Sequence, residues 1–285
     1  MKVMLLAAGK SERLRGLNRG LPKVLIPVLG RPILEHNLRY LKGSGIRQVM
    51  VNLHYHADEV SEFINRRKDW GLSIAFSREE ELLGTAGAVK KAERYFGKSP
   101  FLVMYGDNLT DFDIRKLFAA HRRTKALVTL GVYDPKKTAW SGIAAGLVRV
   151  KGGKVAGFAE KKSNRQVPGG NWVNAGILVA SPGIFRYIPA KRPYDFARDL
   201  FPRLMKKKRV IGATDGASYV LASDNRQALQ KTRRLARTCL NKPPLAARSS
   251  RARRLARTCL NKPPLAAHLS RARRLARNLI EVKRG

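Results

Sequence analysis

The 285-residue sequence predicts an α/β fold in which a mostly parallel sheet carries helices on both faces and continues into an antiparallel hairpin portion. Two observations predict this fold. Up to residue 105, short apolar runs alternate with amphipathic stretches, which is typical of strands and helices in a parallel sheet. From residue 127, strand-like runs follow one another with only short turns between them, as in antiparallel hairpins.

The parallel part begins with an apolar, strand-like run at residues 3–7. Three expected helices then alternate with three expected strands, and in chain order these six runs are 33–41, 48–53, 60–64, 72–76, 86–95 and 101–105. Strands and helices that alternate in this way place helices on both faces of one sheet. This part of the chain therefore predicts a Rossmann-like arrangement.

The hairpin part contains four expected strands, at residues 127–132, 143–150, 155–158 and 172–180. Gly152 and Gly153 lie in the turn between the second and the third of them, where glycines favour a tight hairpin. Helical patterns return at 183–188 and 194–205. Pro202 is expected to kink or break the second of these helices, because proline has no backbone N–H to donate.

Positive charge is concentrated at the end of the chain. The net charge is +38, and residues 226–285 contain 18 Lys or Arg against one acidic residue. The run RRLARTCLNKPPLAA occupies residues 233–247 and again 253–267, an identity that indicates duplication of the coding DNA. Each copy has too little apolar surface to build a stacked core. We therefore expect one domain at 1–230 and a basic, repetitive and poorly ordered tail at 231–285.

The tail has two open interpretations. It is either a basic extension with no dedicated role, or a segment that makes weak contacts with nucleic acid or another anionic surface. Both cysteines, Cys239 and Cys259, lie in it without a second cysteine or a His cluster nearby, which argues against a disulfide framework and a zinc site. No apolar run approaches membrane-spanning length, so we expect a cytoplasmic protein with no membrane span. The oligomeric state is not indicated by the sequence.

The loop after the first strand predicts a phosphate-binding site. The strand runs into small residues that end at Gly9, and such a loop lets backbone N–H groups approach a nucleotide closely. Arg13 and Lys23 would add positive charge opposite its phosphates. A P-loop is excluded, because its spacing would require a glycine at the position of Met4.

A series of short motifs follows along residues 1–230. They are LAAGKSERL at 6–14, PKVL at 22–25, LGTAGA at 83–88, YGDN at 105–108, EK at 160–161, VNAGI at 173–177 and DFARDLFP at 195–202. In this order they resemble the family of nucleotidyltransferases that make nucleotide sugars. Ser11 stands where the family has a second glycine, a replacement that a turn tolerates when φ stays negative.

The resemblance implies an enzyme of the sugar-phosphate nucleotidylyltransferase type, with a nucleoside triphosphate and a sugar 1-phosphate as its partners and Mg²⁺ as its cofactor. It would transfer the nucleotidyl group to the sugar phosphate and release pyrophosphate. The VNLHY run at 51–55 and the GTAGA segment favour a GDP-mannose type of product. The alternatives are a UTP- or dTTP-dependent glucose-1-phosphate nucleotidylyltransferase, and a catalytically weakened protein that binds nucleotide sugars.

The resemblance also implies which residues bind the substrates and catalyse the transfer. The implied catalytic residues are Arg13, Lys23 and Asp107. The implied nucleotide-binding residues are Leu6, Ala7, Ala8, Gly9, Gly84, Thr85, Ala86, Gly87 and Gly106. The implied sugar-phosphate-binding residues are Glu160, Lys161 and Asn174. Three of these assignments have structural alternatives: Asp107 as a turn residue, Thr85 as a helix cap, and the pair at 160–161 as a solvated hairpin end.

The expected metal site departs from the family pattern at its second carboxylate. Asp107 follows a strand of the sheet and is the first expected metal ligand, because Mg²⁺ prefers hard oxygen ligands. Ala222 stands where the family has another aspartate. Asp224 lies two residues further on, hence on the same face of a continuing strand, and is the second expected ligand from this displaced position. If Ala222 instead marks a lost ligand, Ala222→Asp should raise Mg²⁺-dependent activity.

Overall fold

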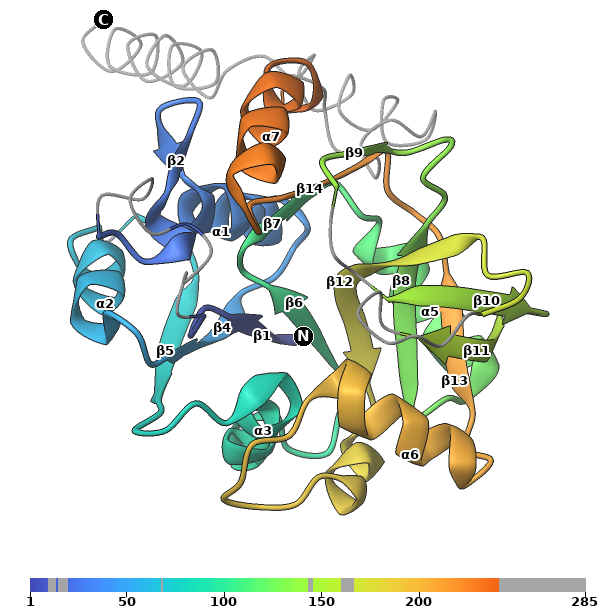
Figure 1. The fold of residues 1–285 in the computed structure, drawn as a ribbon. Helices are drawn as coiled ribbons and strands as arrows, with labels where there is room; N and C mark the ends of the chain where they lie inside the picture. The colour runs from blue at the N-terminus through green and yellow to red at the C-terminus, as the bar shows by residue number, and fades with distance from the viewer. Residues whose placement is uncertain (10–13, 15–19, 68, 143–145, 160–166, 241–285) are drawn as a thin grey trace, which may run out of the picture. The chain divides into compact units, whose positions relative to one another are not determined.

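The computed structural model describes residues 1–9, 14, 20–67, 69–142, 146–159 and 167–240. Its largest sheet contains β1 (Lys2–Leu6), β4 (Gln48–Leu53), β5 (Ser73–Arg78), β6 (Phe101–Tyr105), β8 (Val128–Tyr133), β10 (Leu147–Lys151), β11 (Lys154–Ala159), β12 (Trp172–Ala180) and β13 (Ile211–Thr214). Within the described residues these strands are ordered β10-β11-β13-β8-β12-β6-β1-β4-β5 (Figure 1).

One half of this sheet is parallel. The strands β5, β4, β1 and β6 run in the same direction, and Leu5 is in register with Val51 on one side and Met104 on the other. The strand β12 pairs antiparallel with both β6 and β8 and so ends the parallel part. The predicted hairpin is formed by β10 and β11, whose turn residues Gly152 and Gly153 have φ angles of 56° and 72°.

Helices cover both faces of the sheet. They are α1 (Ile33–Gly43), α2 (Ala57–Asn65), α3 (Gly84–Lys91), α4 (Glu93–Phe96), α5 (Ile114–Thr124) and α6 (Phe201–Lys206), with the 3-10 turn η3 (Pro182–Tyr187) and the π-helical turn η4 (Phe196–Leu200). Val3 and Leu5 of β1 pack in an apolar cluster with α1 and α2, whereas Met4 packs in another with α3, α4 and α6. Successive side chains of a strand point to opposite faces, so each face has its own core. The predicted fold class is confirmed.

A second, smaller sheet places the end of the domain beside the parallel strands. It consists of β7 (Asn108–Thr110), β14 (Tyr219–Ala222) and β9 (Ala139–Trp140). The strands β7 and β14 are antiparallel, with Ala222 opposite Asn108. Helix α7 (Arg226–Cys239) follows and buries Leu229 and Ala236 in a cluster with Leu221 of β14. This packing fixes the short segment between β14 and α7.

The chain between β1 and α1 contributes three short elements. They are the 3-10 turn η2 (Lys23–Leu25) and the strands β2 (Pro27–Val28) and β3 (Arg31–Pro32), which pair with each other. All three residues of η2 are buried, including Lys23. The turn therefore directs a charged side chain toward the interior.

The structure differs from the sequence expectation at two helices. The apolar pattern did not predict α5, which begins after Asp113, an N-cap whose side chain accepts hydrogen bonds from the backbone N–H groups of Arg115 and Lys116.

The expected domain boundary after residue 230 falls inside α7, and the tail beyond residue 240 lies outside the described residues. At Pro202 the helix does not break: η4 passes directly into α6 at Phe201, so only the helix type changes, and Pro202 lies in the first turn of α6. In the part of the chain that the structure describes, no helix is long and apolar enough to cross a membrane.

Candidate active site

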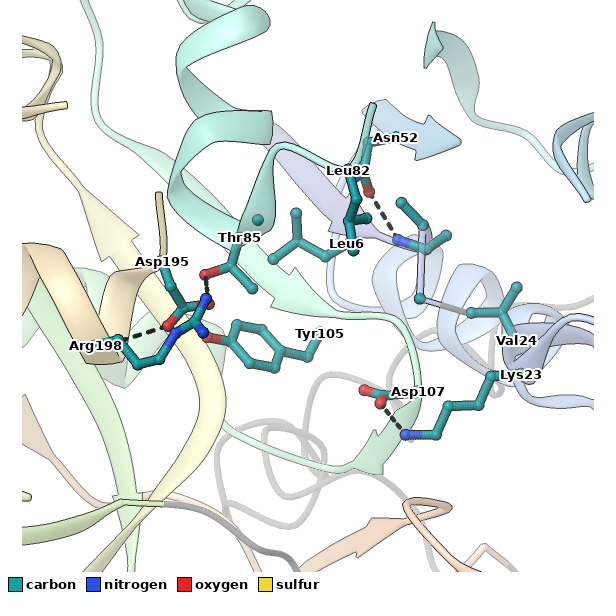
Figure 2. Close-up of a pocket in the computed structure, with 14 residues that line it drawn as sticks. Leu6, Lys23, Val24, Asn52, Leu82, Thr85, Tyr105, Asp107, Asp195 and Arg198 are labelled. Atoms are coloured by element: carbon teal, nitrogen blue, oxygen red, sulfur yellow. Dashed lines mark hydrogen bonds and ion pairs between the residues drawn. The ribbon is translucent and has the colours of Figure 1, made fainter. Parts of the chain in front are cut away.

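A cavity of about 270 Å³ lies at the carboxyl ends of β1, β4 and β6 (Figure 2). Open α/β sheets bind their ligands at this edge. The lining residues that the sequence analysis predicted are Leu6, Ala7, Ala8, Gly9, Lys23, Gly84, Thr85 and Asp107. The remaining lining residues are Val24, Asn52, Leu82, Tyr105, Asp195 and Arg198. Residues from the beginning, the middle and the end of the domain thus share one cavity.

Lys23 connects the two carboxylates that were expected to bind metal. Its Nζ forms an ion pair with Asp107, shown in Figure 2, and a second one with Oδ1 of Asp224 at 2.6 Å. The Lys23 side chain is only 11% exposed. Burial by itself lowers the pKa of Lys23, but the negative charges and hydrogen bonds of Asp107 and Asp224 outweigh burial and raise that pKa above its ordinary value. Lys23 is therefore a fixed positive charge at neutral pH.

The pairing of β7 with β14 brings Asp107 and Asp224 together. Asp107 is the residue before β7, and Asp224 comes two residues after β14, so the antiparallel register places both at the same end of the pair. The Ser223 hydroxyl donates a hydrogen bond to the backbone carbonyl of Asp107 at 3.2 Å, which extends the contact beyond the strands. Asp224 thus reaches Lys23 from the displaced position that the sequence analysis expected, but not on a continuing strand, because β14 ends at Ala222.

Ala222, at the position of the expected family aspartate, faces the protein interior. It is fully buried and belongs to the same apolar cluster as Val220 and Tyr133. Its backbone N–H donates to the Ser141 hydroxyl at 2.7 Å, and its carbonyl accepts a hydrogen bond from the Thr232 hydroxyl at 2.6 Å. A carboxylate at this position would be enclosed by apolar side chains.

The LGTAGA segment enters α3 against a neighbouring backbone segment. Gly84 has a φ angle of 71°, and a Cβ atom there would lie 2.8 Å from the carbonyl oxygen of Tyr194. That oxygen accepts hydrogen bonds from the backbone N–H groups of Ala86 and Gly87, at 3.0 and 2.9 Å. Gly84 lines the cavity, whereas these two N–H groups are used within the protein. The segment therefore shapes the cavity wall and leaves few donors for a ligand.

Thr85 does not act as a helix cap. The N-cap position of α3 is Leu83, without a side-chain cap, which corrects that alternative. The Thr85 hydroxyl instead donates to Oδ2 of Asp195 at 2.7 Å and accepts a hydrogen bond from the backbone N–H of Phe196 at 2.9 Å. Asp195 in turn caps η4 by accepting from the N–H groups of Ala197 and Arg198. Thr85 thus links two walls of the cavity, as Figure 2 shows.

Gly106 and Asn174 are described and lie outside the cavity lining, as do Ala86, Gly87 and Asp224. The backbone N–H of Gly106 donates to the carbonyl of Leu6 at 2.8 Å, and a Cβ atom at Gly106 would lie 2.6 Å from that oxygen. Gly106 is therefore needed for the close approach of the ends of β1 and β6. The Asn174 side chain accepts a hydrogen bond from the backbone N–H of Gly176 at 3.1 Å. Arg13, Glu160 and Lys161 lie outside the described residues, so their expected roles stay predictions.

Several lining residues had no role in the sequence analysis. They are Val24, Asn52, Leu82, Tyr105, Asp195 and Arg198. One signal could have found Asn52, because it is a polar residue near the carboxyl end of a buried strand, where parallel sheets place ligand contacts. Asp195 and Arg198 belong to the DFARDLFP motif that the sequence analysis singled out, but no site role was assigned to that motif.

The described carboxylates suit a magnesium ion that shares its ligands with a nucleotide. No group of three or more His, Cys, Asp or Glu side chains that could hold a metal occurs among the described residues. Mg²⁺ commonly binds one or two carboxylates and takes its remaining ligands from phosphates and water. Asp107 and Asp224 are such a pair, and the contact that each makes with the cation of Lys23 shows that both can serve one positive charge.

The chain was compared with known proteins. Residues 2–219 match the family model described as nucleotidyl transferase. Over 216 residues the chain is 32% identical to the UTP–glucose-1-phosphate uridylyltransferase of Synechocystis sp., a match that covers 72% of this chain and 55% of that relative. The D-glycero-α-D-manno-heptose 1-phosphate guanylyltransferase of Aneurinibacillus thermoaerophilus is 30% identical over 220 residues, which cover 77% of this chain and 92% of that relative.

Solved structures share the fold. HddC from Yersinia pseudotuberculosis has a TM-score of 0.68 at 23% identity, with 82% of this chain and 98% of that chain covered. A protein from Bacillus anthracis described as a putative glucose-1-phosphate thymidylyltransferase has a TM-score of 0.70 at 22% identity, with 86% of this chain and 99% of that chain covered. The chain spans little more than half the length of the Synechocystis relative and most of the heptose enzyme. The match over residues 2–219 shows that the chain belongs to the nucleotidyl transferase family.

Proposed function

We propose that this protein transfers a nucleotidyl group from a nucleoside triphosphate to a sugar 1-phosphate and releases pyrophosphate. The observation that carries the proposal is the ion-paired cluster of Lys23, Asp107 and Asp224, whose first two members line the same cavity as the small-residue loop ending at Gly9. A cation beside two potential metal ligands, next to a loop that a phosphate can approach closely, suits a triphosphate.

This reaction requires little acid or base chemistry from the protein. The phosphate of the sugar is largely dianionic near neutral pH, because its second pKa is about 6, and can attack the α-phosphorus directly. The protein must hold the two phosphates in line and offset their negative charge. Lys23 supplies a positive charge at a fixed point, and Asp107 and Asp224 would hold the Mg²⁺, which neutralises phosphate charge when bound.

We further propose a GDP-mannose type of product, as the sequence favoured. The heptose 1-phosphate guanylyltransferase of Aneurinibacillus thermoaerophilus and the mannose-1-phosphate guanyltransferase of Yarrowia lipolytica, 29% identical over 212 residues, support guanine as the base. The Synechocystis uridylyltransferase supports the second candidate, a UTP-dependent glucose-1-phosphate enzyme. A protein that kept the cavity and lost turnover is the third candidate, because Ala222 replaces the expected aspartate.

A substrate grid tests the proposal. Full-length protein is incubated with GTP, UTP or dTTP against mannose 1-phosphate, heptose 1-phosphate or glucose 1-phosphate, with and without Mg²⁺, and pyrophosphate release is followed. We expect Mg²⁺-dependent release that needs both substrates and is fastest with GTP. Fastest release with UTP would support the second candidate. Nucleotide binding without pyrophosphate release for any substrate pair would support the third candidate. The absence of both binding and release would refute a nucleotidyltransferase role.

A further inference from the structure

Two buried polar side chains connect two segments of the chain that line the cavity. Asn52, 3% exposed, lies near the end of β4, and its Oδ1 accepts a hydrogen bond from the backbone N–H of Ala7 at 2.7 Å. Its Nδ2 donates to Oε1 of Glu79 at 2.7 Å. Glu79, 5% exposed, accepts a further hydrogen bond at Oε2 from the backbone N–H of Leu83 at 3.0 Å. Three consecutive hydrogen bonds thus run from the loop after β1 to the entry of α3.

The backbone around Glu79 is held as well. Its N–H donates to the carbonyl of Leu53 at 2.8 Å, and its carbonyl contacts Nδ1 of His54 at 2.9 Å. Both oxygens of the Glu79 carboxylate are thus occupied, and its backbone is tied to the end of β4. A buried carboxylate that is satisfied in this way has a defined position, whereas an unsatisfied one would be costly.

The location of the hydrogen bonds of Asn52 and Glu79 indicates a role in positioning as well as in stability. Ala7 belongs to the lining residues 6–9, and Leu83 lies between the lining residues Leu82 and Gly84, so the network joins two segments that line the cavity. An apolar pair of similar volume could fill the same space, but it would leave the backbone N–H groups of Ala7 and Leu83 without these acceptors. Directional hydrogen bonds add a fixed spacing between the two backbone segments.

We propose that Asn52 and Glu79 are positioning residues that set the distance between the two nucleotide-contacting loops. They act through the backbone of Ala7 and Leu83 and not on the reacting phosphates. The inference rests on the proposed function, because it takes the ligand of the cavity to be a nucleoside triphosphate. It adds a pair of residues to which neither the sequence analysis nor the cluster around Lys23 assigns a role.

A polarity swap tests the pair. In Asn52→Asp, the new carboxylate still accepts from Ala7 but faces the carboxylate of Glu79. In Glu79→Gln, the new amide must present its N–H₂ group either to the Asn52 amide or to the Leu83 N–H, so one donor faces another. The double variant Asn52→Asp/Glu79→Gln restores all three hydrogen bonds, with the central one reversed in direction.

A second double variant separates positioning from folding. Asn52→Leu/Glu79→Met fills the same space with apolar side chains but gives the backbone N–H groups of Ala7 and Leu83 no acceptor, so its affinity is interpreted only where the variant is folded. Glu62→Gln is the matched control, because Glu62 pairs with Arg66 at 2.7 Å on the exposed surface of α2. The dissociation constants of GTP, UTP and dTTP are measured by calorimetry on full-length protein, and folding is monitored by circular dichroism.

We expect each single variant and the apolar double variant to bind the preferred triphosphate about tenfold more weakly than wild type, the loss expected for a broken buried hydrogen bond. The polarity swap should bind within about threefold of wild type, as should Glu62→Gln. Wild-type affinity in the folded apolar variant would overturn the inference, and so would a swap no better than the weaker single variant. If wild type binds no triphosphate, the proposed function itself fails.

Discussion

Nζ of Lys23 lies 2.6 Å from Oδ1 of Asp224, although 201 positions separate the two residues in the chain. The lysine comes from the turn η2 near the amino terminus, and the aspartate from the segment between β14 and α7. The contact therefore forms only when the second sheet has folded onto the first. The contact links the start of the domain to its end. Asp107, which lies between β6 and β7, is the third partner.

Removal of the Lys23 charge should reduce turnover. We expect Lys23→Ala to lower kcat by about a hundredfold or more, by analogy with the removal of one donor that stabilises a transition state. The measurement is the steady-state rate of pyrophosphate release at saturating substrates. A kcat within about threefold of wild type would contradict the catalytic role of Lys23.

Lys116 offers a matched control for this substitution. It also pairs with an aspartate at 2.6 Å, Asp215, but both side chains are about half exposed and neither lines the cavity. Ion pairs of this exposed kind contribute little to stability. Lys116→Ala should therefore leave both turnover and stability close to their wild-type values, which separates the effect of the site from the effect of losing a lysine.

Asp224→Asn should raise the Mg²⁺ concentration needed for half-maximal activity. The change keeps the shape of the side chain and removes the charge that a divalent cation needs. The check is a Mg²⁺ titration of pyrophosphate release, with Asp215→Asn as the surface control. An unchanged titration curve would show that Asp107 and the substrate phosphates hold the metal without Asp224.

Ala222→Asp should fail to increase activity, in contrast to what a lost-ligand interpretation expects. Ala222 is fully buried in the core, so a carboxylate there would be desolvated. We expect the free energy of unfolding to fall by about 2 kcal/mol or more, as measured by urea denaturation. A stable variant with higher Mg²⁺-dependent activity would show that the family position still reaches the metal.

Gly84→Ala should destabilise the domain because of both backbone conformation and space. The φ angle of 71° is strained for any residue with a Cβ atom, and that atom would lie 2.8 Å from the carbonyl oxygen of Tyr194. We expect a loss of about 1–3 kcal/mol in the free energy of unfolding. Gly43→Ala, where no described atom lies within 4 Å of the added Cβ, is the control and should cost little. Equal stability of the two variants would refute the close contact.

His121 should make stability fall as the pH drops. Burial between Thr129 and Ser181 lowers the pKa of His121 to about 4 from its ordinary 6.5. Between these values the unfolded chain binds a proton that the folded chain does not, so stability decreases as pH falls from about 6.5 toward about 4. Urea unfolding of wild type and His121→Gln at several pH values measures this, and the variant should show a smaller decrease. Parallel curves for both proteins would exclude this contribution.

The sequence predicted those parts of the fold that depend on local pattern. The strands 48–53, 101–105 and 172–180 coincide with β4, β6 and β12, because each is a long apolar run bounded by turns. The helix α5 was not predicted, because its sequence, IRKLFAAHRRT, is rich in charges and buries only a narrow apolar face. Its start was nevertheless marked by a good N-cap, Asp113.

The candidate site was predictable where a residue follows directly from a strand. Asp107 and the loop that ends at Gly9 come from strand ends, where parallel sheets bind ligands. Asp195, Arg198 and the hydrogen bond between Asn52 and Glu79 depend on which distant segments become neighbours. That information lies in the order of the strands, which local periodicity does not specify.

The most direct test of the central claim, one cavity for a metal-bound triphosphate, is a crystal structure of the chain with Mg²⁺ and a non-hydrolysable GTP analogue. The account predicts the ion at about 2.0–2.1 Å from carboxylate oxygens of Asp107 and Asp224, with Nζ of Lys23 on a phosphate oxygen. It also predicts the triphosphate against the loop that ends at Gly9. A nucleotide bound outside this cavity, or a metal that contacts neither carboxylate, would contradict it.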